Sequence, residues 1–82
     1  MQVTIKYFAS IREAIGQASE QRETATTTLA GLRDELLAID PAYACLSRGR
    51  AVRMALGQVM SDESALLSPG CEVAFFPPVT GG

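Results

Sequence analysis

The sequence predicts an α+β domain in which one main helix packs across a mixed sheet of four to five strands. Two patterns support this prediction. Residues 2–8 and 72–76 have the alternation or the apolar content of strands, and residues 29–39 have the apolar periodicity of a helix. The 82 residues are enough for one domain with a small core, so we expect no deep active-site cavity between two lobes.

The first strand is expected over residues 2–8, followed by a short helical turn over 9–15. Ser10 is expected to be the N-cap of this turn, and Gly16 is expected to end it. Phe8 falls on the outer parity of the strand. The residues expected to face inward are Val3, Ile5 and Tyr7.

The middle of the chain combines a polar segment with the clearest helix. Residues 17–26 are polar and rich in threonine, which fits an edge strand. The helix over 29–39 can be capped by Thr28, and it ends before Pro41 because the residue preceding a proline is pushed out of the helical region. Arg33 is expected on its outer arc. Its apolar stripe consists of Leu29, Leu32, Leu36 and Ile39, widened by Leu37.

The second half of the chain predicts three short strands, at 52–56, at 59–60 and at 72–76. Turns and loops are expected at 42–46, 47–50, 57–58, 61–64 and 68–70. The first and last strands are the most apolar, so we expect them to lie together at the centre of the sheet. This order of elements predicts a β-grasp, or ubiquitin-like, domain over residues 1–76.

Composition excludes several classes of function. The net charge of −2 and the single lysine, Lys6, do not provide the basic face that binds nucleic acid. No apolar run approaches the roughly 20 residues that span a bilayer, and the N-terminus lacks the pattern of a signal peptide. We therefore expect a cytoplasmic protein that binds neither nucleic acid nor membrane.

Side chains suited to catalysis or metal binding are scarce. Histidine, the commonest general base and metal ligand, is absent. Cys45 and Cys71 have no CxxC spacing, so we expect ordinary small residues and no metal site. A disulfide between them would be unusual in a reducing compartment.

The C-terminal segment is the strongest candidate for chemistry. Residues 77–82 are expected to form a flexible tail that begins with two prolines and ends with two glycines. The prolines stiffen its base, the six residues can extend about 20 Å, and the glycines can pass through a narrow channel. A carboxylate on such a tether can be activated as an acyl-adenylate. The alternative is a frayed chain end without a function.

The whole chain resembles the MoaD family, the small, sulfur-carrying subunit of molybdopterin synthase. The most specific stretch is 72–82, and residues 7–13 are similar to the family's aromatic-Ala-x-apolar-Arg-Glu segment. Two departures are mild: Gly57-Gln58 stands where relatives often have Asn-Gln, and Met60 where they often have leucine.

The resemblance implies a carrier that is not catalytic alone and binds no cofactor stably. An E1-like adenylyltransferase would use ATP to adenylylate Gly82, and a sulfur donor enzyme would then convert it to a thiocarboxylate. The loaded tail would enter the large catalytic subunit of the synthase, in a heterotetramer, and deliver sulfur to the pterin precursor of the molybdenum cofactor. Gly81 would supply clearance. The guided tether would consist of Pro77, Pro78, Val79 and Thr80.

The resemblance also implies a partner interface. Phe8, Met60 and Phe76 match positions where the family presents an apolar patch, and the alternative is that each is a core residue or an isolated exposed apolar residue. Arg12 can meet an acidic group of a partner, and the alternative is a solvated surface arginine. Three other functions remain open: a sulfur carrier for thiazole synthesis, a ubiquitin-like modifier joined to lysines of target proteins, and an interaction module with an inert tail.

Overall fold

The computed structural model describes residues 1–47 and 51–78, and these form one five-stranded sheet with helices. The elements in chain order are β1 (Gln2–Tyr7), α1 (Ala9–Ile15), β2 (Ser19–Glu23), α2 (Leu29–Ile39), the 3-10 helix η1 (Pro41–Leu46), β3 (Arg53–Leu56), β4 (Val59–Ser61) and β5 (Glu72–Phe76). Each strand and helix expected from the sequence is present. The bounds of α1, α2 and β5 are those expected, and the ends of the other strands differ by at most three residues.

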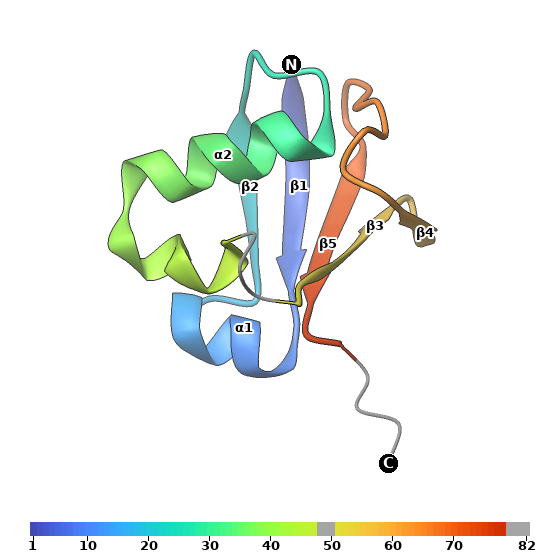
Figure 1. Ribbon diagram of the computed structural model, residues 1–82. Helices are drawn as coiled ribbons and strands as arrows, with labels where there is room; N and C mark the ends of the chain where they lie inside the picture. The colour runs from blue at the N-terminus through green and yellow to red at the C-terminus, as the bar shows by residue number, and fades with distance from the viewer. Residues whose placement is uncertain (48–50, 79–82) are drawn as a thin grey trace.

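The strand order in the sheet is β2-β1-β5-β3-β4. β1 pairs with β5 in parallel, and the other neighbouring pairs are antiparallel. The prediction that the first and last strands lie together is confirmed, and the polar segment after α1 is confirmed as the edge strand β2. Because β5 lies at the centre of the sheet, the chain leaves the domain from the middle of one sheet end (Figure 1).

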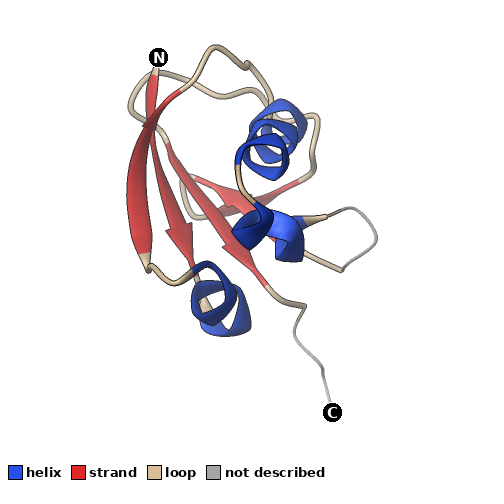
Figure 2. Cartoon of the chain, turned by 90° about the vertical axis from the view of Figure 1, so that its left-hand side faces the viewer, coloured by secondary structure: helices blue, strands red, loops and turns tan. Residues whose placement is uncertain are grey.

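The two faces of the sheet differ. α2 and η1 lie on one side of it, here called the inner face, and α1 lies at the end of the sheet near the exit of the chain (Figure 2). The inner residues of the central strands are opposite one another, because Ile5 pairs with Val73 and Tyr7 with Phe75. No helix in residues 1–47 and 51–78 covers the opposite side, here called the outer face.

The core lies between the inner face and α2. Its largest fully buried side chains are Tyr7, Phe75, Ile5, Leu29, Leu32, Leu36, Leu46, Val3 and Val73. Burial of this apolar surface is the main stabilising contribution in a domain of this size.

The prediction for α2 was correct in its bounds and wrong at two side chains. Arg33 follows Leu29 by four residues, so it lies about 40° from Leu29 around the helix and beside the apolar stripe. It is buried and forms an ion pair with Glu63. Ile39 is 50% exposed, because the C-terminal end of α2 projects beyond the β2 edge of the sheet (Figure 1).

The prediction that Ser10 caps α1 was wrong. The N-cap is Phe8, in an extended conformation and without a side-chain hydrogen bond. The Phe8 carbonyl instead accepts hydrogen bonds from the N–H groups of Ile11 and Arg12, at 3.1 and 3.3 Å. Since β1 ends at Tyr7, the helix begins before Ser10 is reached. Gly16 ends the helix as expected, with a φ of 91°.

The sequence contains no apolar run long enough to span a bilayer. Residues 1–47 and 51–78 contain no helix that is long and apolar enough to span a bilayer.

Candidate docking face and tail base

The outer face carries an apolar strip that crosses three strands. In the strand register, Lys6 of β1 lies opposite Ala74 of β5, Ala74 opposite Ala55 of β3, and Ala55 opposite Met60 of β4. Ala55 is buried although no helix covers it, because its neighbours on the sheet surround its small side chain. The centre of the strip is therefore made of small side chains, Ala55 and Ala74.

Phe8 and Phe76 form the end of the outer face nearest the chain exit. Their rings make an edge-to-face contact, with centroids 6.4 Å apart and planes at 83°. The Phe8 N–H donates a hydrogen bond to the Phe75 carbonyl at 3.2 Å, which continues the β1–β5 pairing by one residue. Phe8 is 46% exposed and Phe76 is half-buried.

Met60 lies at the β4 edge of the strip and is 54% exposed. The structure therefore brings Phe8 and Phe76 into contact and places Met60 on the same face, two strands from Phe76. Arg12 is exposed on α1, one helical turn after Phe8. We use the name docking face for Phe8, Ala55, Met60, Ala74 and Phe76.

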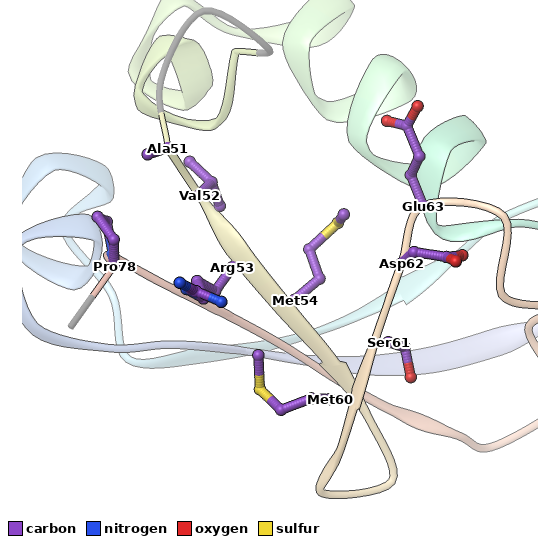
Figure 3. A pocket seen from close by; sticks show the side chains of 9 residues that line it. All are labelled: Ala51, Val52, Arg53, Met54, Met60, Ser61, Asp62, Glu63 and Pro78. Carbon is purple, nitrogen blue, oxygen red and sulfur yellow. The ribbon is translucent and has the colours of Figure 1, made fainter.

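Two shallow grooves meet at the base of the tail. One has a volume of about 360 Å³ and is lined by Arg53, Met60 and Pro78 with their neighbours on β3 and after β4 (Figure 3). The other, of about 340 Å³, lies between the tail base and α1, and includes Pro77 and Cys45. Pro77 and Pro78 are half-buried, so the base of the tail is packed against the domain.

The other predicted tail residues, Val79, Thr80, Gly81 and Gly82, lie outside the described residues. The direction of the exit is nevertheless defined, because Phe76 belongs both to β5 and to the docking face. A partner that covers this face also lies beside the chain exit.

Charges surround the docking face. Lys6 Nζ lies 3.4 Å from Glu72 Oε1, and Arg53, opposite Phe76 in the register, is exposed. In the groove, hydrogen bonds from the Ser64 hydroxyl and N–H, at 2.5 and 2.9 Å, lower the pKa of Asp62. Neither Lys6 nor Arg53 was predicted to belong to the site. Along β3 the exposed Arg53 precedes the buried Met54, so the two side chains lie on opposite faces of the sheet.

A partly buried polar cluster consists of Tyr7, Glu20 and Tyr43. The Tyr43 hydroxyl donates a hydrogen bond to Glu20 Oε2 at 2.8 Å. The Tyr7 hydroxyl has no hydrogen-bond partner among the described residues. Burial raises the pKa of Tyr7, and the negative charge of Glu20 raises it further. This cluster lies on the inner side of the sheet, because Glu20 pairs with Ile5 and Tyr7 belongs to the core.

Cys45 and Cys71 are half-buried thiols packed against the core. Within residues 1–47 and 51–78, no group of three potential metal-ligating side chains occurs.

The sheet order and the helix packed across one face define a ubiquitin-like β-grasp protein. SAMP1 from Haloferax volcanii superposes with a TM-score of 0.80 at 23% identity, covering 100% of both chains. A putative molybdopterin converting factor, subunit 1, from Pyrococcus furiosus gives a TM-score of 0.79 at 23% identity, over 96% of this chain and 99% of that one. These similarities show the fold.

Residues 5–82 match the ThiS family, and the chain belongs to this family. The molybdopterin synthase sulfur carrier subunit of Escherichia coli (strain K12) is 31% identical over 80 residues, or 98% of this chain and 99% of that protein. The subunit with the same name from Haemophilus influenzae is 33% identical over 81 residues, with the same coverage. The predicted resemblance to MoaD proteins is confirmed.

One related structure includes a partner. It is the complex of subunits 1 and 2 of the molybdopterin-converting factor from Helicobacter pylori, with a TM-score of 0.70 and 23% identity over the full length of both chains. That protein therefore has the same fold and assembles with a second subunit.

Proposed function

We propose that this protein is the sulfur carrier subunit of a molybdopterin synthase. The observation that carries the proposal is the position of the docking face beside the chain exit. Phe76 ends β5 within this face, and Pro77 follows it directly. A large subunit bound to the face would receive the tail in a defined direction. The full-length similarity to two sulfur carrier subunits supports the same function.

The chemistry would take place at the carboxylate of Gly82. An E1-like adenylyltransferase joins this carboxylate to the AMP part of ATP, and pyrophosphate leaves. A sulfur donor enzyme then supplies sulfur at the oxidation level of sulfide. This sulfur attacks the carbonyl carbon, the C–S bond forms, the C–O bond to AMP breaks, and a thiocarboxylate results. This group is a better nucleophile than a carboxylate, and the large subunit uses it to transfer sulfur to the pterin precursor.

The domain would supply binding and orientation in this scheme. Aromatic and methionine side chains are enriched at the centres of protein interfaces, and the docking face has both types at its exposed ends. The half-buried prolines at the tail base limit the directions in which the reactive end can move. Such restriction lowers the entropy lost when the tail enters a narrow site.

Intact-mass measurement tests the proposal directly. The chain is incubated with the adenylyltransferase, ATP and the sulfur donor, and replacement of one oxygen by sulfur at Gly82 is expected. The loaded chain is then mixed with the large subunit and the pterin precursor, and formation of the dithiolene product is measured. A chain lacking Gly82 is the matched control and should gain no sulfur.

The three alternatives give different products. A thiazole-pathway carrier would gain sulfur but deliver it to thiazole synthesis and not to the pterin. A protein modifier would form amide bonds to lysines of other proteins. An inert module would show no mass change, and that result would refute the proposed function.

A further inference from the structure

The docking face borders a nucleophile that the proposed sulfur chemistry does not use, the amine of Lys6. Lys6 is the only lysine in the sequence. Its side chain is 43% exposed, and its Nζ lies 3.4 Å from Glu72 Oε1. A reagent can therefore reach this amine in the unbound protein.

Lys6 is also part of the outer face. It pairs with Ala74 on the adjacent strand β5, and Ala74 pairs in turn with Ala55 on β3. With strands about 4.8 Å apart, its Cα lies roughly 10 Å from that of Ala55. A partner that covers the docking face would therefore cover Lys6 as well.

We propose that Lys6 is a regulatory acylation site, at which an acyl group blocks docking of the large subunit. This proposal rests on the proposed function. In the step, the unprotonated amine of Lys6 attacks the carbonyl carbon of an acyl thioester. The C–N bond forms, the C–S bond breaks, a thiolate leaves and the amine proton passes to solvent. The product is an amide, and no oxidant or reductant is consumed.

Two physical effects oppose docking of the acylated protein. The amide carries no charge, so Glu72 loses its ion-pair partner. The Glu72 side chain is only 33% exposed, and a partner would bury this carboxylate further without a counter-charge, which is costly. The added acyl group also occupies space between the two surfaces, where close packing is required.

The first experiment measures affinity for the large subunit by calorimetry, before and after treatment with acetyl-N-hydroxysuccinimide. Mass mapping confirms complete acetylation of Lys6. The expected result is a loss of affinity of about tenfold or more. Lys6→Gln, which introduces a neutral amide without a chemical reagent, should also weaken binding.

Two variants isolate the effect of Lys6. Lys6→Arg keeps a positive charge and cannot be acetylated in this way, so its affinity should be the same before and after treatment. The double variant Lys6→Arg/Ala38→Lys moves the only lysine to an exposed position on α2, on the inner side of the sheet. Acetylation at residue 38 should leave its affinity unchanged. Both variants also control for acetylation of the N-terminal amine.

The second experiment uses acetyl coenzyme A as the acyl thioester. Lys6 of the free chain should be acetylated, and saturating large subunit should slow this reaction, whereas the relocated lysine at residue 38 should react at the same rate in both states. If fully acetylated wild-type protein binds as tightly as untreated protein, the Lys6 proposal is wrong and the proposed function stands. If untreated protein does not bind the large subunit, both are wrong.

Discussion

Neighbouring side chains along the central strands face opposite sides of the sheet, the core on one side and the docking face on the other. Tyr7 and Phe8 are consecutive, yet Tyr7 is fully buried on the inner side while Phe8 is exposed on the outer side. The same alternation separates Phe75 from Phe76 on β5. The parallel pairing of β1 with β5 brings the two outer rings into contact.

Phe76→Ala should weaken binding to the large subunit by about 2 kcal/mol or more, as loss of an interface anchor does. The isolated domain should remain folded, because Phe76 is not part of the buried core. Calorimetry measures the affinity and thermal denaturation the stability. Ile39→Ala, which removes an exposed apolar side chain at the far end of α2, is the matched control and should bind normally. An unfolded Phe76→Ala domain with unchanged affinity per folded molecule would place Phe76 in the core.

Tyr7→Phe should maintain or raise the free energy of unfolding at neutral pH, by up to about 1 kcal/mol, because it removes a buried hydroxyl without a partner. Tyr43→Phe is the contrasting variant. It removes the hydrogen bond to Glu20 and should lower the free energy of unfolding by about 1 kcal/mol. Urea denaturation at pH 7 measures both changes. A marked loss of stability in Tyr7→Phe would mean that its hydroxyl has a partner in solution.

The same variant has a predicted pH dependence. Burial raises the pKa of Tyr7 in the folded protein, whereas tyrosine in the unfolded chain ionises at about pH 10. As the pH rises, the Tyr7 hydroxyl therefore loses its proton in the unfolded chain before it does so in the folded protein. The free energy of unfolding is unaffected by this ionisation below about pH 10 and falls as the pH rises above it. Denaturation between about pH 9 and 11 should therefore show a smaller loss of stability for Tyr7→Phe than for the wild type.

The helices show which parts of the fold can be predicted from local sequence. The bounds of α2 follow from its apolar spacing, from Thr28 and from Pro41, all within the segment. The burial of Arg33 depends on Glu63, which lies 30 residues further along the chain. The start of α1 likewise depends on the place where β1 ends its pairing with β5. Contacts between distant segments are not visible in local patterns, so these features could not be predicted.

Thr28→Ala should lower the free energy of unfolding by about 1 kcal/mol. The Thr28 hydroxyl accepts a hydrogen bond from the Gly31 N–H at 3.1 Å, and alanine cannot replace this acceptor at the start of α2. Chemical denaturation measures the change. Thr27→Ala alters the preceding exposed side chain and should have an effect within about 0.5 kcal/mol. Equal effects of the two substitutions would contradict a capping contribution.

For the molecule as a whole, the partner interface that the resemblance to MoaD proteins implies stays a prediction, and the structure adds the residues that surround it. Phe8, Met60 and Phe76 were expected on one surface, and the structure places all three on the outer face. Ala55 and Ala74 complete the docking face between them, and Lys6 and Arg53 border it. Their membership depends on the strand register, which brings residues of four strands together and which the sequence alone does not define.

The proposed chemistry requires the reactive carbon to lie at a fixed distance from a rigid domain. Adding one residue after Gly82, or deleting Gly82, moves that carbon by about 3.5 Å along an extended tail. A displacement of about 1 Å can already lower a rate about a hundredfold, so both changes should abolish sulfur delivery. Gly81→Ala should also be harmful where the channel has no space for a methyl group.

Product formation from the pterin precursor, with chemically loaded variants and purified large subunit, measures this effect. Affinity of the unloaded variants for the large subunit is the control and should change little, because the docking face is intact. Normal delivery by the extended variant would show that Gly82 is not the carrier position.

The central position of β5 has a consequence for the synthesis of the protein. β5 is the strand nearest to Gly82, and both β1 and β3 pair with it. Until β5 has been made, these two strands have no common neighbour, and Ala74 and Phe76 are missing from the docking face. Such long-range pairing delays folding until distant segments can meet. A nascent chain stopped before β5 therefore presents no complete surface to the large subunit, so incomplete copies cannot compete with finished carriers for its binding site.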